Sequence, residues 1–321
     1  MKSIQRDDIH LIARYSDLSE NAVDKALHEQ VYPKADAWRT FLRLFFLTFG
    51  IGFSVMGILF FFAYNWEELH KFIKIGLIEG LLIMLTGVAL YPKFSQQTKK
   101  IILCGCSLLV GVLFAVFGQV YQTGANAYDF FLAWTIFISI WVLITNFAPL
   151  WLFFLALINC TLILYNQQVA SDWSPVLFNM GLALLNGAAL LLGILLSISA
   201  KKIHVPTYFS NIVALAAVSF ATIGMVIGIF EKLDWCLALC AAIVSLTYYL
   251  GIRYALKQRN GFYLASLAFS IIIIFSASII EIVEDEAVGA IFVCGFVLAS
   301  VTFVVHQLLN LQKTKTHGTQ E

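Results

Sequence analysis

The sequence has few charged residues. Asp, Glu, Lys and Arg make up 12% of its 321 residues, about half the share in ordinary soluble domains, while hydrophobic residues make up 60%. A water-soluble fold of this size could not cover that much apolar surface with so few charges. The composition therefore excludes a soluble globular protein, an intrinsically disordered chain and a nucleic-acid-binding domain. The remaining class is an all-α polytopic membrane protein.

Proline and the motifs of reactive sites are also scarce. The five Pro residues all lie at or beyond the ends of apolar runs, so the commonest sign of a broken transporter helix is missing. The six Cys residues lie inside apolar runs, which argues against a disulfide framework. No pair of His residues has metal-ligand spacing, and no Gly-rich phosphate loop or nucleophile elbow occurs. We therefore expect no enzymatic activity, no metal and no cofactor.

What the sequence does contain is a series of long apolar runs. Each is close to the 20 residues, roughly, that a helix needs to cross the hydrocarbon core of a bilayer. They predict ten transmembrane helices over residues 42–64, 72–91, 100–121, 127–146, 148–165, 175–197, 208–230, 233–256, 261–281 and 287–308.

The distribution of Lys and Arg predicts the orientation of these helices. With the N-terminal side taken as the inside, 17 of the 20 basic residues fall in inside segments. The outside keeps Lys71, Lys74 and Lys232, and it carries most of the acidic residues. Cytoplasmic loops of membrane proteins carry an excess of Lys and Arg, so this split predicts an even number of spans with both termini cytoplasmic.

The apolar runs also divide the chain into segments. Five helices in each half would give the halves opposite topology, as in inverted-repeat transporters, although no sequence repeat is visible. The expected segments are a cytosolic helical head at 1–41 with short helices over 5–15 and 19–31, transmembrane helices 1–5 at 42–165, transmembrane helices 6–10 at 171–310, and a disordered cytosolic tail at 311–321.

Glu79 is the one acidic residue well inside a predicted span. It lies about 7 residues from the outer end, which is roughly 10 Å deep at 1.5 Å per residue. An ionisable group at that depth is a functional candidate, because it is costly to bury in a membrane. The alternative is a hydrogen bond to a neighbouring helix with no role in transport. Gly76 and Gly80 flank Glu79 and, like Gly224 and Gly228, have the spacing of a small-xxx-small pair, which predicts close helix packing.

A second polar feature lies between the third and fourth spans, on the predicted outer side. The stretch from Gly118 to Asp129 contains Gln119, Tyr121 and Gln122 and ends at the carboxyl of Asp129. The outer end of the first span supplies Asn65 and Trp66. Because short loops join these spans, we expect the side chains to converge in an outer vestibule. The alternative is a polar turn of helix caps.

These residues resemble a known family. Ala63-Tyr64-Asn65-Trp66 and the block from Gly118 to Ala125, Gly-Gln-Val-Tyr-Gln-Thr-Gly-Ala, are similar to a bacterial family of predicted membrane proteins, the family of unknown function numbered 2157. The resemblance covers about residues 8–165, and such proteins also begin with a short cytosolic helical region. It implies a bacterial inner-membrane protein and adds interest to Asn65, Trp66, Gln119, Tyr121 and Gln122. It implies no substrate.

Two kinds of function remain. The sequence favours a secondary transporter of a small solute or ion, with Glu79 as the titrating or ion-binding group and Gln119–Asp129 as an outer vestibule. The alternative is a non-catalytic scaffold or sensor that binds an envelope partner through its outer face. The expected partners are the lipid bilayer, a small solute or ion, and another membrane protein or a second copy of the chain. Nucleic acid is not among them.

The topology prediction can be tested by labelling. In a Cys-free background, a single Cys at position 172 should react with a membrane-impermeant maleimide from outside, because the charge bias places this loop there. A Cys at position 201 should react only after the inside is opened. Labelling of position 201 from outside would show that the number of spans is wrong.

Overall fold

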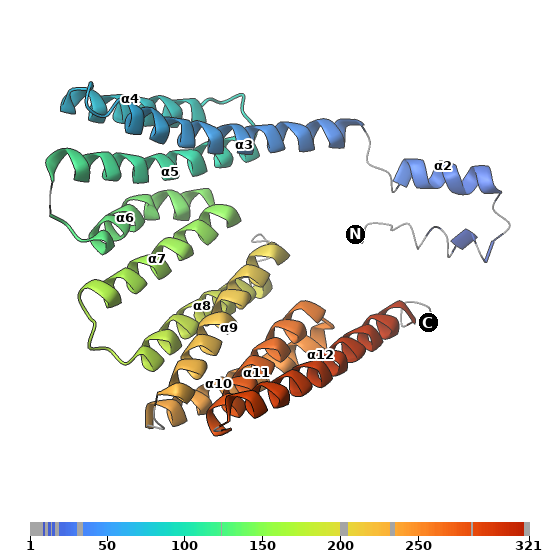
Figure 1. The fold of residues 1–321 in the computed structure, drawn as a ribbon. Coiled ribbons are helices and arrows are strands. Elements are labelled where there is room, and N and C mark those ends of the chain that lie inside the picture. Colours follow the sequence, from blue (N-terminus) through green and yellow to red (C-terminus); the bar gives the residue numbers. More distant parts are fainter. Residues whose placement is uncertain are drawn as a thin grey trace. The chain divides into compact units, whose positions relative to one another are not determined.

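The computed structural model describes residues 9, 12–13, 15–16, 19–30, 35–122, 124–199, 205–231, 235–283 and 285–317, and these ranges are helical apart from turns and connections (Figure 1). The helices are α2 (Glu20–Gln30), α3 (Ala35–Tyr64), α4 (Lys71–Ala89), α5 (Gln96–Tyr121), α6 (Ala127–Thr145), α7 (Ala148–Gln168), α8 (Pro175–Ser199), α9 (Thr207–Phe230), α10 (Trp235–Gln258), α11 (Gly261–Ile282) and α12 (Glu286–His317).

The expectation of ten membrane-crossing helices is confirmed. In the described part of the chain, ten helices, α3 to α12, are long and apolar enough to cross a membrane. Their ends agree with the predicted runs within a few residues, except that α3 begins earlier and α12 ends later. The second helix of the predicted head is α2, whereas most of the first, 5–15, lies outside the described residues.

The chain forms two compact units, Met1–Thr123 and Gly124–Glu321. The first contains α3 to α5 and the second contains α6 to α12. Since this division follows contacts and not sequence symmetry, the inverted repeat of two five-helix halves stays a prediction.

In the first unit, α5 is the central packing element. Both α3 and α4 pack on it. The shared core contains Val55 and Phe62 from α3, Ile78 from α4, and Leu109 and Val116 from α5. At Gly105 of α5 there is no room for a side chain, because a Cβ there would overlap the γ-methyl of Ile51 on α3. Glycine therefore lets α3 and α5 approach closely.

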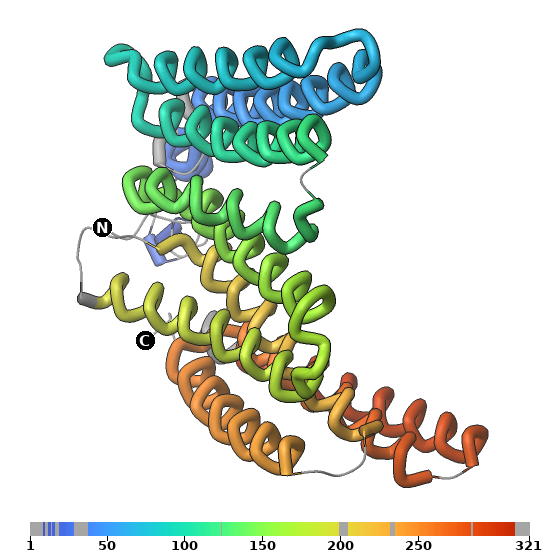
Figure 2. Tube along the Cα trace, turned by 90° about the vertical axis from the view of Figure 1, so that its left-hand side faces the viewer, coloured from blue at the N-terminus to red at the C-terminus, as the bar shows by residue number. Residues whose placement is uncertain are grey.

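In the second unit, α6 packs on α7, α8 packs on α9, and α11 packs on both α9 and α12; Figure 2 shows these helices from green (α6) to red (α12). Side chains of α8, α9, α10 and α11 form one buried core. Of the two predicted small-xxx-small pairs, the pair in α9 packs closely: a Cβ at Gly224 would lie 3.3 Å from the carbonyl oxygen of Val176. Gly76 and Gly80 have no such neighbour among the described residues, because a Cβ at either would meet no atom within 4 Å, so close packing there stays a prediction.

Several helix ends are set by capping residues. Ser95 accepts a hydrogen bond from the amide of Thr98 at the start of α5, at 3.2 Å. Gln122 and Asn146, with φ of 44° and 43°, end α5 and α6 in the left-handed region. A polar residue that accepts amide hydrogen bonds or tolerates positive φ is typical of such positions.

The contact at Gly105 predicts that two Gly→Ala changes in α5 affect the stability of the protein differently. Gly105→Ala should destabilise the protein by about 1–3 kcal/mol, because the new methyl group overpacks the contact with Ile51. Gly118→Ala, at a position of α5 where a Cβ meets no atom within 4 Å, should be neutral or stabilise by up to about 1 kcal/mol through helix propensity. Thermal unfolding in detergent measures both. Equal effects of the two changes would contradict the close approach.

Candidate functional site

Trp66, one of the residues predicted for the outer vestibule, makes a close contact with Lys74 in the first unit. Trp66 follows the end of α3 and packs against the core that α3, α4 and α5 share. The Nζ atom of Lys74, in the first turns of α4, lies 3.7 Å from the centroid of the Trp66 ring. This is a cation–π contact, in which the negative face of the indole attracts the ammonium group.

The position of Lys74 is costly without this ring. Its side chain is only 7% exposed, and no carboxylate within the described ranges forms an ion pair with it. It also lies near the N-terminus of α4, where the helix dipole disfavours positive charge. Trp66 is thus the group that compensates the buried ammonium. The charge distribution in the sequence assigns Lys74 only to the outer side. Its burial depends on the rotation of α4, which the sequence does not give.

The other predicted vestibule residues of this unit make separate contacts. Asn65 donates from Nδ2 to the carbonyl oxygen of Phe61, at 2.9 Å within its own helix turn. The Tyr121 ring packs against Phe117 of its own helix, tilted by 46°, with ring centroids 4.6 Å apart. Gln119 and Gln122 are exposed. Within residues 35–122, no hydrogen bond connects Asn65 or Trp66 with these three, so their convergence in one pocket stays a prediction.

Asp129, the predicted member from the second unit, caps a helix. Its Oδ2 accepts a hydrogen bond from the amide of Asn126, at 3.0 Å, and the two residues form a capping box at the start of α6. Nearby, the amide of Tyr128 donates to Oε1 of Gln168 at the end of α7, at 3.2 Å. The alternative interpretation of this segment, a polar turn with helix caps, therefore describes Asp129.

Glu79 lies on the exposed side of α4. It is the ninth residue of a 19-residue apolar helix, and its side chain is exposed. Lys74 and Ile78 point instead into the contact with α5. Five residues correspond to about 140° around a helix, so Glu79 and Lys74 face different ways. Glu79 forms no hydrogen bond or ion pair with any side chain in the described part of the protein.

The second unit contains buried hydroxyl groups that sequence reasoning missed. Ser270 of α11 lies 2.6 Å from Thr222 of α9 and 2.6 Å from Tyr248 of α10. Thr222 donates to the carbonyl oxygen of Val218, at 2.7 Å. With that proton committed, the chain runs from Tyr248 to Ser270 to Thr222 to the carbonyl, and each hydroxyl donates once. Three helices are joined by a network that leaves no donor free.

A pair of amides makes a similar connection between α7 and α8. Asn186 donates to Oδ1 of Asn159 at 2.8 Å, and Asn159 donates back at 3.2 Å. Each also donates to the carbonyl four residues earlier in its helix, at 2.7 Å for Asn159 and 2.9 Å for Asn186. Among the described residues, three buried oxygen atoms lack a hydrogen-bond partner: Asn166 Oδ1, Asn211 Oδ1 and Ser276 Oγ.

These arrangements suit structure better than chemistry. No group of three or more His, Cys, Asp or Glu residues in the described ranges could hold a metal ion. The polar side chains in the middle of the second unit hydrogen bond to one another. Asn159 and Asn186, inside apolar runs, are typical of hydrogen bonds between helices, and the Ser and Thr hydroxyls could have been suspected in the same way. Which of these side chains meet depends on helix pairing.

The cation–π contact can be tested by a double-mutant cycle. Trp66→Leu should lower stability, because the ammonium of Lys74 loses its partner. In a Lys74→Met background the same change should cost about 1–2 kcal/mol less, since methionine keeps the volume without the charge. SDS-titrated unfolding in mixed micelles measures all four proteins. Additive effects would show that the ring and the ammonium do not interact.

In a comparison with known proteins, part of the chain matches the model of one protein family. No curated protein and no solved structure matches the chain. Residues 15–151, which contain Asn65, Trp66 and the block from Gly118 to Ala125, match the model of the family described as predicted membrane protein, DUF2157. The resemblance of the N-terminal half to this family is thereby confirmed.

Proposed function

We propose that the protein is a non-catalytic membrane scaffold that assembles with a second copy of itself through helix α4. The observation that carries the proposal is the position of Glu79, the carboxyl group in the middle of α4, on an exposed apolar face. Ile83 and Phe72, which are 72% and 64% exposed, lie about one and two turns away on the same side.

The energetics of the bilayer argue that this face is covered. A charged side chain at the centre of a membrane helix costs about 2.5–3.5 kcal/mol on insertion scales, and intramembrane acids almost always face a partner or a water-filled cavity. Gly76, about 60° around the helix from Glu79, leaves room for a second backbone, as small residues do at helix interfaces in membranes.

The chemistry of the carboxyl group favours a second copy as the partner. A protonated carboxyl has one donor and one acceptor, so two copies of Glu79 related by a two-fold axis can satisfy each other. A hydrogen bond between helices of this kind contributes about 0.6 kcal/mol on average in a membrane. The glycine contact would supply the rest through packing.

A secondary transporter, the other expected function, draws less support from the same side chains. Carriers bind substrate near the bilayer midplane at sites that have free polar groups. The hydroxyl chain around Ser270 and the amide pair of Asn159 and Asn186 use their donors on each other and on backbone carbonyls. Glu79 remains the group through which transport would be coupled if it occurs.

The cellular location is part of the same proposal. We place the protein in the cytoplasmic membrane of a bacterium with both termini inside. The bias of 17 of 20 basic residues toward one side supports this orientation.

Photocrosslinking in native membranes tests self-assembly. Benzophenylalanine at position 83, about 40° around the helix from Glu79, should give a product of twice the chain mass. The matched control is position 77, which is 48% exposed but lies about 160° from Glu79, and it should give none. Glu79→Gln should keep the crosslink, because an amide also donates and accepts. Glu79→Leu should weaken association about threefold.

Two results would contradict the scaffold. Equal crosslinking from positions 83 and 77 would show that the contact is not specific to this face. If the protein conducted a solute or protons across proteoliposomes and Glu79→Gln changed that flux, the protein would be a transporter.

A further inference from the structure

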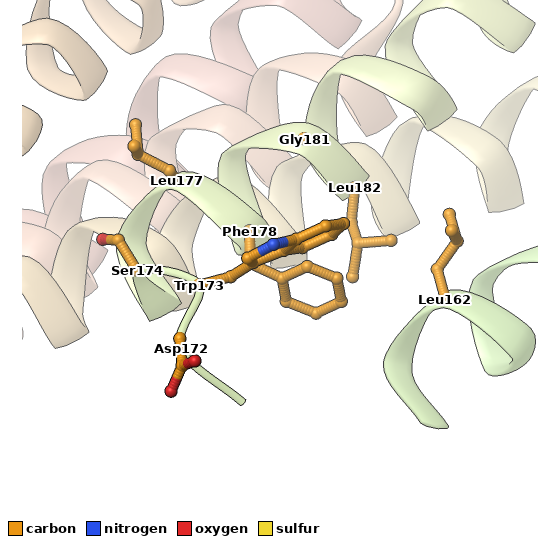
Figure 3. A pocket seen from close by; sticks show the side chains of 8 residues that line it. All are labelled: Leu162, Asp172, Trp173, Ser174, Leu177, Phe178, Gly181 and Leu182. Carbon is orange, nitrogen blue, oxygen red and sulfur yellow. The ribbon is translucent and has the colours of Figure 1, made fainter. Parts of the chain in front are cut away.

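A groove opens at the connection between α7 and α8 (Figure 3). Its volume is about 610 Å³. The side chains that line it come from the end of α7, from the connection and from the first two turns of α8. They are Leu162, Asp172, Trp173, Ser174, Leu177, Phe178, Gly181 and Leu182.

The groove is polar at one end and apolar at the other. Asp172 and Ser174 lie in the connection, outside the two spans that end at Gln168 and begin at Pro175. Leu162, Gly181 and Leu182 lie inside those spans, and Figure 3 shows Leu162 facing Leu182 across the opening. This arrangement fits a molecule with a polar head at the membrane interface and a hydrocarbon chain below it.

The walls of the groove are held in place. The amide of Trp173 donates to the carbonyl oxygen of Ala170 at 3.2 Å, and that of Phe178 donates to Ser174 at 2.9 Å. The Trp173 ring lies 5.9 Å from Tyr165 and 6.4 Å from Phe178, between centroids. Trp173 is nevertheless 52% exposed, so part of its surface is accessible to a ligand.

The charge around the groove selects a cationic head. Residues 101–200 contain no Lys, Arg or His, and their two acids are Asp129 and Asp172. Asp129 is engaged as the cap of α6, whereas Asp172 lines the groove from the connection, and its carboxylate extends away from α8 (Figure 3). An ammonium group beside Asp172 would be attracted by its carboxylate and by the exposed indole of Trp173.

We infer that this groove binds a phospholipid whose head group carries a primary ammonium, with one acyl chain between α7 and α8. The inference does not depend on self-assembly through α4, because every residue that forms the groove belongs to α7, α8 or their connection.

Lipid titration by native mass spectrometry of the full-length protein tests the inference. Phosphatidylethanolamine should bind about fivefold more tightly than phosphatidylglycerol, the preference that one exposed ion pair provides. Asp172→Asn should remove that preference. Gly181→Leu should weaken binding of both lipids, because its side chain enters the groove at a position where a Cβ meets no atom within 4 Å. Gly187→Leu, on the same helix outside the groove, is the matched control and should bind as the unmodified protein does.

Three results would overturn the inference. They are equal affinity of the unmodified protein for the two lipids, a preference for the ammonium lipid that survives Asp172→Asn, and lipid binding that Gly181→Leu does not change. Since Asp172 is exposed, the Asn variant should fold normally, and the head-group test stands even if the Gly181 variant does not fold.

Discussion

Inside a bilayer no water is present to satisfy a polar side chain, so each must find its partner within protein or its own backbone. Two polar clusters of the second unit follow this constraint, whereas the buried side-chain oxygens of Asn166, Asn211 and Ser276 have no partner among the described residues. Asn159 and Asn186 pair with each other, and Thr222, Tyr248 and Ser270 form a chain that ends on a backbone carbonyl. Each cluster joins different helices, so the polar groups also specify which helices are neighbours. Apolar surfaces alone distinguish neighbours poorly, because lipid tails are as apolar as the side chains they replace.

The first unit meets the same constraint in two different ways. Lys74 is buried and is compensated by the ring of Trp66, a partner that provides attraction without a carboxylate. Glu79, one and a half turns further along α4, faces outward and has no compensating group among the described residues. The same helix thus presents a satisfied charge toward α5 and an unsatisfied carboxyl on its other side. This asymmetry is the reason for assigning assembly to α4.

Sequence reasoning predicted the parts of this protein that depend on length, composition and local chemistry. The apolar runs gave the spans, and the polar segment from Gly118 to Asp129 was open to interpretation as a turn with helix caps, which the box of Asn126 and Asp129 bears out. The rotation of each helix could not be predicted in the same way. The apolar runs are hydrophobic on all sides, so they do not indicate that Lys74 faces α5 or that Gly76 and Gly80 remain open. Contacts such as Ser270 with Tyr248 depend on helix pairing, which only the fold defines.

The absence of basic residues from 101–200 also bears on how the protein enters the membrane during synthesis. Orientation signals in a nascent chain are mainly Lys and Arg close to the ends of its helices. The connection between α6 and α7, at Asn146 and Phe147, has none, and the next bases after Lys99 and Lys100 are Lys201 and Lys202. The ends of α6 and α7 therefore carry no Lys or Arg that would orient these two helices during insertion. The orientation of α6 and α7 is therefore determined by the orientation of α5. If α5 were inserted in the opposite direction, α6 and α7 would invert with it.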